Sequence, residues 1–233
     1  MRRIIEKTGL LLTDNQIMQF EKYYEMLIET NKIMNLTAIT DRNEVIEKHF
    51  VVSLLCIKAI DLNIINSLID VGTGAGFPGI PLKIAFPHLQ VTLMDSLNKR
   101  VGFLQEVIEE LNLENIIAVH DRAEDMARKP EYREQFDLCV SRAVANLAVL
   151  SEYCLPFIKT GGAFLSYKSG KVAEEISEAE KAIEILGGKT EKIEQFYLPG
   201  TDVERSIVVI RKENPTPEKY PRKPGAALKK PLK

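Results

Sequence analysis

A cluster of glycines at residues 70–79 is the part of the sequence whose residue types and spacing point most directly to chemistry. The segment reads Asp-Val-Gly-Thr-Gly-Ala-Gly-Phe-Pro-Gly. Glycine has no Cβ, so it suits a sharp turn between a strand and a helix where the backbone passes close to a ligand. We therefore predict a loop that binds a nucleotide-containing cofactor through Gly72, Gly74 and Gly76, with Pro78 in the first turn of the next helix.

The glycines alone do not identify the cofactor. Gly74, Gly76 and Gly79 also fit the pattern of dinucleotide sites, so a nicotinamide or flavin oxidoreductase is an alternative. Two aspartates favour S-adenosylmethionine instead. Asp70 precedes the glycines, where a carboxylate would attract this cationic methyl donor and repel a pyrophosphate. Asp95 ends the next predicted strand, at the spacing expected for a carboxylate that binds ribose hydroxyls.

Two further polar segments follow predicted strands and should meet the glycine loop at one edge of the sheet. Asp121 to Glu124 follows the third strand, where such folds hold the adenine ring, although an ordinary helix cap has the same pattern. Ser141 and Arg142 end the fourth strand, where an acceptor would meet the donor methyl group. This position lacks the Asn/Asp-Pro-Pro-aromatic motif common in methylases of exocyclic amines, which indicates a different acceptor atom.

Short strands alternate with amphipathic helices from residue 67 onward, which predicts an α/β fold of the Rossmann-like class I methyltransferase type. The predicted strands are 68–71, 91–94, 116–119, 138–141, 163–167, 190–197 and 206–210, and the predicted helices between them are 99–111, 147–158 and 172–186. Because only a loop separates the last two strands, they should pair antiparallel. The sheet should thus have seven strands, be mostly parallel and end in an antiparallel hairpin.

The segments on either side of this core have their own character. Helices predicted at 13–32 and 41–59 form an N-terminal helical cap over residues 1–66, ahead of a core domain at 67–211. Residues 212–233 contain five prolines and few large apolar side chains, so this tail either drapes over the domain or becomes ordered on the substrate. From residue 211 onward the chain carries eight basic and two acidic residues, whereas residues 1–210 have a net charge of −8. Such a tail suits an RNA phosphate backbone, or it is simply solvated.

Several classes of protein are disfavoured by composition. The three cysteines are odd in number and show no C-x-x-C spacing, so we expect buried thiols and neither a disulfide framework nor a metal site. The N-terminus has no signal-peptide core, and no apolar run is long enough to span a bilayer. We therefore expect a cytoplasmic protein that has no contact with membranes.

Taken in order, motifs along most of the chain resemble the small-subunit ribosomal RNA methyltransferase G family, also called glucose-inhibited division protein B. These bacterial enzymes methylate guanine at N7. The similar segments are 35–39 (NLTAI), 48–50 (KHF), 70–81, 95–100, 122–124, 141–143, Arg205 and 220–223. The chain departs from the usual family pattern at two positions. It has Val52 before Ser-Leu where the family usually has aspartate, and Ala227 in the tail where the family usually has proline.

The resemblance implies an S-adenosylmethionine-dependent 16S ribosomal RNA (guanine-N7)-methyltransferase. Its partner would be 16S RNA within a small ribosomal subunit or its precursor, with no obligate protein partner. The expected catalytic residues are Arg142 and Ser141, and the expected donor-binding residues are Asp70, Gly72, Gly74, Gly76, Phe77, Asp95, Ala123, Glu124 and Arg142. The expected RNA-binding residues are Asn98, Lys99, Arg100, Lys168, Arg205, Arg222 and Lys223.

Guanine N7 has a lone pair and no proton, so its in-line attack on a methyl group needs positioning and no general base. Arg142 is therefore a better candidate for a functional residue than any of the three histidines, His49, His88 and His120. Three alternatives remain besides the ribosomal RNA methylase. They are a small-molecule methylase of the same fold, an oxidoreductase, and a non-catalytic RNA-binding protein.

Overall fold

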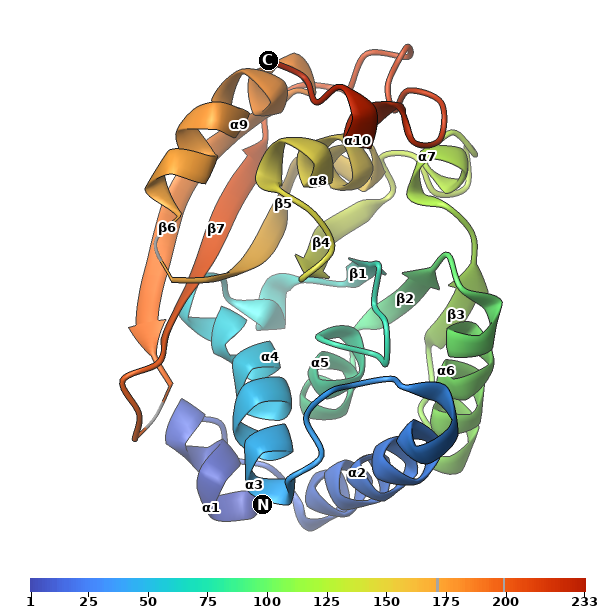
Figure 1. Ribbon diagram of the computed structural model, residues 1–233, viewed down its shortest axis with the longest axis vertical. Coiled ribbons are helices and arrows are strands. Elements are labelled where there is room, and N and C mark those ends of the chain that lie inside the picture. The colour runs from blue at the N-terminus through green and yellow to red at the C-terminus, as the bar shows by residue number, and fades with distance from the viewer. Residues whose placement is uncertain (171, 199) are drawn as a thin grey trace.

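The computed structural model describes residues 1–170, 172–198 and 200–233, and its centre is a seven-stranded sheet in the order β3-β2-β1-β4-β5-β7-β6 (Figure 1). The strands are β1 Ser67–Val71, β2 Gln90–Asp95, β3 Ile116–His120, β4 Phe136–Arg142, β5 Ile158–Ser169, β6 Gly188–Tyr197 and β7 Glu204–Lys212. Strands β1 to β5 pair in parallel, whereas β7 is antiparallel to both β5 and β6. The predicted fold, including its terminal hairpin, is confirmed.

Helices cover both faces of this sheet. They are α1 Arg2–Ile5, α2 Asp14–Met34, α3 Arg42–Val45, α4 Val52–Leu54, α5 Gly79–Ala85, α6 Asn98–Glu110, α7 Ala123–Met126, α8 Leu147–Cys154, α9 Ala173–Ile185 and α10 Ala226–Lys229. Alternate residues of each strand point to opposite faces. On β1, Leu68 packs into a core shared with the N-terminal helices, while Ile69 packs into the core under α8 and α9.

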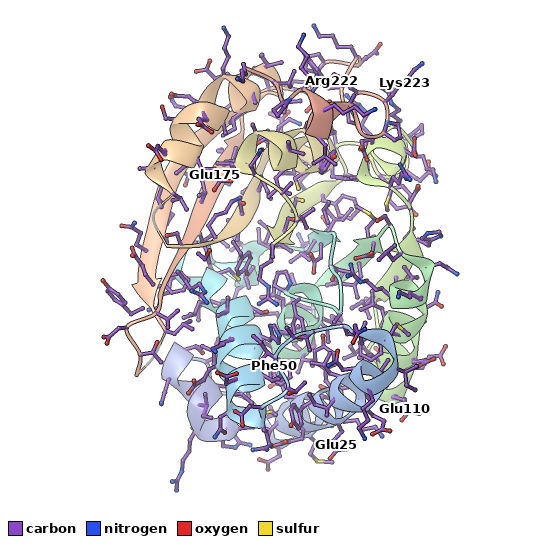
Figure 2. All side chains as sticks on the ribbon, in the orientation of Figure 1. Glu25, Phe50, Glu110, Glu175, Arg222 and Lys223 are labelled. Carbon is purple, nitrogen blue, oxygen red and sulfur yellow. The ribbon has the colours of Figure 1, made fainter. Side chains whose placement is uncertain are left out.

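The N-terminal helical cap is built into the first of these cores. Thr13 and Gln16 form the predicted capping box at the start of α2, and Tyr23 and Phe50 are buried in the same cluster as residues of β1 and β4. Figure 2 shows Phe50 in the interior beside these helices. Because Tyr23 donates a hydrogen bond to the carbonyl of Ala75, the cap also touches the glycine loop.

The segment predicted as one helix over 41–59 is helical from Arg42 to Lys58, and Asp41 caps it as predicted, but it is not a regular α-helix throughout. A π-helical segment at Ile46–Val51 separates α3 from α4, and a 3₁₀ turn follows at Leu55–Lys58. In the π-helical segment, the carbonyl of Lys48 accepts a hydrogen bond from Arg142. In α4, the carbonyl of Ser53 accepts one from the Tyr167 hydroxyl. The irregular helix thus contacts the distant strands β4 and β5, and the local sequence pattern does not predict these contacts.

Two proline-related boundaries also differ from the sequence prediction. The helix predicted over 147–158 ends at Cys154, because Pro156 follows in a 3₁₀ turn and has no N–H to continue the helical bonding. Strand β5 then begins at Ile158, five residues before the predicted start. Pro78 precedes α5 as its N-cap residue and is not part of its first turn.

After β7 the tail folds back over the domain, which is one of the two outcomes predicted for it. Arg133 donates hydrogen bonds to the carbonyls of Thr216 and Tyr220, at 2.8 and 2.9 Å. Tyr220 and Ala227 are buried in the core that contains α8. Figure 1 shows α10, in red, lying beside α8 and near α7. Within the described ranges, no helix has the length and apolar character to cross a bilayer.

Candidate active site

The glycine loop closes tightly around the carboxylate of Asp70. Its Oδ2 accepts hydrogen bonds from the Gly79 amide at 2.8 Å and from the Thr73 hydroxyl at 2.6 Å. A Cβ on Gly79 would lie 2.9 Å from this oxygen and 2.3 Å from Leu93, so the close approach requires glycine. Gly72 adopts a φ of 71°, in the left-handed region.

Asp70 is fully buried, and its Oδ1 has no hydrogen-bond partner. Burial raises the pKa of this carboxyl to about 7, although the bonds from Thr73 and Gly79 and the nearby charge of Arg142 oppose the shift. The sequence predicts that this side chain faces the donor. In the structure Oδ2 holds the loop, whereas Oδ1 is buried without a hydrogen-bond partner.

A cleft of about 340 Å³ lies beside the glycine loop at the carboxyl ends of β1, β2 and β3, and we call it the donor cleft. Its lining residues are Val71, Gly72, Met94, Ser96, Leu97, Arg122, Ala123, Glu124, Val144, Tyr153, Gly225 and Leu228. Three of the predicted donor-binding residues, Gly72, Ala123 and Glu124, are therefore brought together. The volume is in the range of about 300–1,000 Å³ typical of small-molecule sites.

The other predicted donor-binding residues, Asp70, Gly74, Gly76, Phe77, Asp95 and Arg142, do not line this cleft. Gly76 packs against α2, because a Cβ there would lie 2.7 Å from the Tyr23 hydroxyl. Asp95 is 2% exposed and accepts hydrogen bonds from the amides of Gly74 and Leu97, at 2.9 and 3.0 Å. It therefore ties the end of β2 to the glycine loop. A Cβ on Gly74 would have no atom within 4 Å, which leaves open space at this turn. Phe77 is buried and faces Arg142.

A second cavity, of about 330 Å³, lies on the other side of the segment that follows β4, and we call it the acceptor cavity. Its lining residues are Ile39, Lys48, His49, Val52, Arg142, Ala143, Ala145, Tyr167, Lys168, Ser169 and Arg205. Ala143 and Ala145 line this cavity, whereas Val144 between them lines the donor cleft. A short segment of chain thus borders both spaces.

Arg142 is held at this border by contacts with the N-terminal cap. Its guanidinium donates to the Lys48 carbonyl at 3.3 Å and to His49 Nδ1 at 3.1 Å, and lies 5.0 Å from the centre of the Phe77 ring. The His49 ring stacks on Phe77 with 4.6 Å between ring centres. Arg142 thus joins three elements that are far apart in the sequence.

His49, which the sequence made a weaker candidate for a functional residue than Arg142, contacts Arg142 directly. Burial and the neighbouring Arg142 lower the pKa of His49 to about 3, so its ring is neutral. Since Nδ1 accepts from Arg142, Nε2 carries the proton and donates to the Thr37 hydroxyl at 2.8 Å. Its presence in the KHF segment, and that of Thr37 in NLTAI, was the only sequence signal for this arrangement.

The expectation that Ser141 is catalytic is wrong. Its side chain is fully buried, and its hydroxyl donates to the carbonyl of Val71 at 2.8 Å. The bond joins β4 to β1 inside the sheet, away from both cavities. Ser141 therefore supports the sheet and lines neither cavity.

The predicted RNA-binding residues divide into three groups by their surroundings. Asn98, Lys99 and Lys223 are exposed, and Lys223 lies on the tail at one end of the molecule (Figure 2). Arg205 lines the acceptor cavity. Arg100 lies 3.4 Å from the buried carboxylate of Asp95.

Two more of the basic residues predicted to bind RNA, Lys168 and Arg222, also have partners within the protein. The ammonium of Lys168 lies 2.6 Å from Glu175 and 3.1 Å from the Ala145 carbonyl, and its side chain is 11% exposed. Arg222 forms an ion pair of 2.6 Å with Glu152, whose side chain is 1% exposed. These internal contacts occupy part of each charged group, and Lys168 also lines the acceptor cavity, so the expectation that Lys168 and Arg222 contact phosphates stays a prediction. Across the described part of the chain, no cluster of His, Cys, Asp or Glu has the form of a metal site.

Comparison with known proteins decides the family. The profile of the rRNA small subunit methyltransferase G family (GidB) matches residues 16–208. This chain belongs to that family. It is 57% identical over 228 residues to the ribosomal RNA small subunit methyltransferase G of Lachnoclostridium phytofermentans, covering 98% of this chain and 94% of that protein. The corresponding protein of Desulforamulus reducens is 56% identical over 95% of this chain and 92% of its own length.

Solved structures agree at the level of the fold. M. jannaschii TYW2, determined in complex with AdoMet, matches with a TM-score of 0.55 over 75% of this chain and 79% of its own, at 17% sequence identity. At such low identity the similarity shows the shared Rossmann-like architecture. The family membership therefore rests on the sequence matches, and the fold on both comparisons.

Proposed function

We propose that this protein transfers a methyl group from S-adenosylmethionine to N7 of a guanine in 16S ribosomal RNA. The observation that carries the proposal is the pair of cavities on either side of residues 143–145, with Arg142 at their border. Membership in the small-subunit ribosomal RNA methyltransferase G family supports the choice of acceptor. Two adjoining spaces of similar volume suit a donor and a base that meet at one point.

The donor cleft fits S-adenosylmethionine in three respects. It lies at the carboxyl ends of the parallel strands, where such folds bind nucleotides. The backbone near Gly74 is open to a ligand, and the unpartnered Oδ1 of Asp70 lies beneath the same loop. A carboxylate there favours the cationic donor over an anionic dinucleotide.

The acceptor side is arranged to hold a base and not to remove a proton from it. S-adenosylmethionine supplies an electrophilic methyl group, and guanine N7 supplies the lone pair. His49 has both ring nitrogens in hydrogen bonds and a low pKa, so it is not placed to act as a general base. Arg142 and the neighbouring cavity wall then contribute positioning, which accounts for much of the rate in such transfers.

The substrate in this proposal is a folded RNA surface, within a small ribosomal subunit or its precursor. Asn98, Lys99 and Lys223 are exposed polar or basic side chains suited to phosphate contacts. A cytoplasmic location and the absence of an obligate protein partner belong to the same proposal.

Labelled methyl transfer to purified small subunits, followed by mapping of the modified nucleotide, tests this function directly. We expect label at N7 of one guanine in 16S RNA, and loss of that modification in cells that lack the protein. Label in a metabolite would favour a small-molecule methylase. Tight RNA binding without any transfer would favour a non-catalytic RNA-binding protein, and binding of NAD in place of S-adenosylhomocysteine would favour an oxidoreductase.

A further inference from the structure

Part of the wall of the donor cleft comes from the C-terminal tail. Gly225 and Leu228, at the start and within the short helix α10, line the cleft together with residues that follow β1, β2 and β3. Leu228 is 62% exposed although Ala227 beside it is 1% exposed. The helix therefore buries one side against the domain and leaves a large apolar side chain at the cleft.

Leu228 has a counterpart on the core domain. Leu97, which precedes α6, lines the same cleft and is 43% exposed. Two exposed leucines in one small cleft leave apolar surface in water, and a flat apolar ligand group would cover it. The purine ring of the donor has this chemistry.

The tail is fixed where it meets the cleft. The amide of Gly225 donates to Oε1 of Glu124 at 2.9 Å, and Glu124 is itself 7% exposed and lines the cleft. A few residues earlier, Arg222 contacts both carboxylate oxygens of the buried Glu152. These contacts anchor α10 at the cleft.

We propose that Leu228 is a donor-binding residue and that α10 forms the wall which covers the adenine ring of S-adenosylmethionine. The inference rests on the proposed function, because it takes this donor as the ligand. Since Glu124 contacts the tail and also lines the cleft, donor binding and tail docking stabilise each other. The basic tail thus has a role at the donor that is separate from any contact with RNA.

Calorimetric titration with S-adenosylhomocysteine tests the contact in the full-length protein. Leu228→Ala should weaken binding about tenfold, as expected for the loss of roughly 1.4 kcal/mol of apolar contact. Lys229→Ala is the matched control, because Lys229 is exposed on the same helix and does not line the cleft. It should leave the affinity unchanged. Equal affinities for the wild-type protein and Leu228→Ala, with both proteins folded, would overturn the proposal.

Limited trypsin digestion of the wild-type protein gives a second readout that needs no substitution. Saturating S-adenosylhomocysteine should slow cleavage after Lys229 several-fold, because the ligand holds α10 in place. Unchanged cleavage at this site, with slower cleavage elsewhere, would place the ligand away from the tail. If the wild-type protein binds no S-adenosylhomocysteine at all, the proposed function fails, whereas binding that is insensitive to Leu228 contradicts only the role of the tail.

Discussion

Arg142, His49 and Thr37 are linked by hydrogen bonds. Which atom donates in each bond depends on the protonation of His49. The neutral ring accepts from Arg142 and donates to Thr37, so a second ring proton would face the guanidinium. The same reasoning applies to Asp70, whose charge is suppressed by burial until near neutral pH. Both groups therefore connect the geometry of the site to pH.

We predict that His49 makes the folded protein sensitive to acid. The pKa of His49 falls from 6.5 to about 3 on folding, so between these values only the unfolded chain takes up the proton, and stability is lost as pH falls. The contribution of His49 to this loss between pH 7 and pH 4.5, taken as the difference between the wild-type protein and His49→Gln, should be about 2 kcal/mol. Urea unfolding of the wild-type protein and of His49→Gln at both pH values measures it. Parallel pH dependence of the two proteins would contradict the assignment.

Asp70 should have the opposite effect on stability and a separate effect on the donor. Its pKa is raised from 3.8 to about 7, so the fold retains the proton in this window and stability falls as pH rises through it. The ionised carboxylate attracts a cationic ligand, so S-adenosylmethionine, whose sulfonium gives it a net positive charge, should bind several-fold more tightly at pH 8 than at pH 6. Calorimetry at the two pH values measures this change. Asp70→Asn should remove the dependence, and a variant that retains it would refute the role of this residue.

At the scale of elements, the segment between β4 and α8 brings the donor cleft and the acceptor cavity together. Ala143 adopts a φ of 58°, which costs energy for a residue with a Cβ and persists only where neighbours hold it. Lys168 on β5 binds the Ala145 carbonyl, and Glu175 on α9 binds both Lys168 and the amide of Leu147. An ion pair between two other elements therefore fixes the segment.

Glu175→Gln should lower kcat for methyl transfer about tenfold at saturating donor, because small displacements at a reacting centre have large effects on rate. The variant retains hydrogen-bonding atoms but loses the charge that pairs with Lys168. Glu178→Gln is the matched control, since Glu178 is on the same helix and lines the same cavity near the end of the tail as Glu175, but Lys168 and the Leu147 amide bond to Glu175. Single-turnover kinetics with labelled donor distinguishes the two variants. An equal effect of both substitutions would show that the loss reflects α9 in general and not the segment.

At the scale of the whole molecule, the tail is a structural part of the domain as well as its most basic segment. Its prolines prevent a core of its own, yet Tyr220 and Ala227 are buried against α8, and Arg133 binds its carbonyls. Ala227 thus occupies the position where the family usually has proline, and it lies on the buried side of α10. The acidic body and the basic tail are joined by the Glu152–Arg222 pair.

Arg222→Ala should lower the free energy of unfolding by about 2–3 kcal/mol, because it leaves the carboxylate of Glu152 buried and unpaired. Lys223→Ala should change it by less than about 0.5 kcal/mol, as is usual for an exposed side chain. Equilibrium denaturation in urea compares the two variants at pH 7. A small effect of Arg222→Ala would mean that the ion pair contributes little to docking of the tail.

The sequence by itself determined the order of strands and helices, the glycine loop, the antiparallel end of the sheet and the family. These features depend on local periodicity, on the φ that glycine permits and on motifs that recur in order. Only the tertiary structure decided that Ser141 and Asp95 are buried and hydrogen-bonded within the protein, that Lys168 and Arg222 pair with Glu175 and Glu152, and that His49 contacts Arg142. Each of these outcomes depends on partners from 7 to 93 residues away in the chain. The linear pattern identifies which side chains are polar, whereas the packed molecule determines which are shielded from water and what they contact.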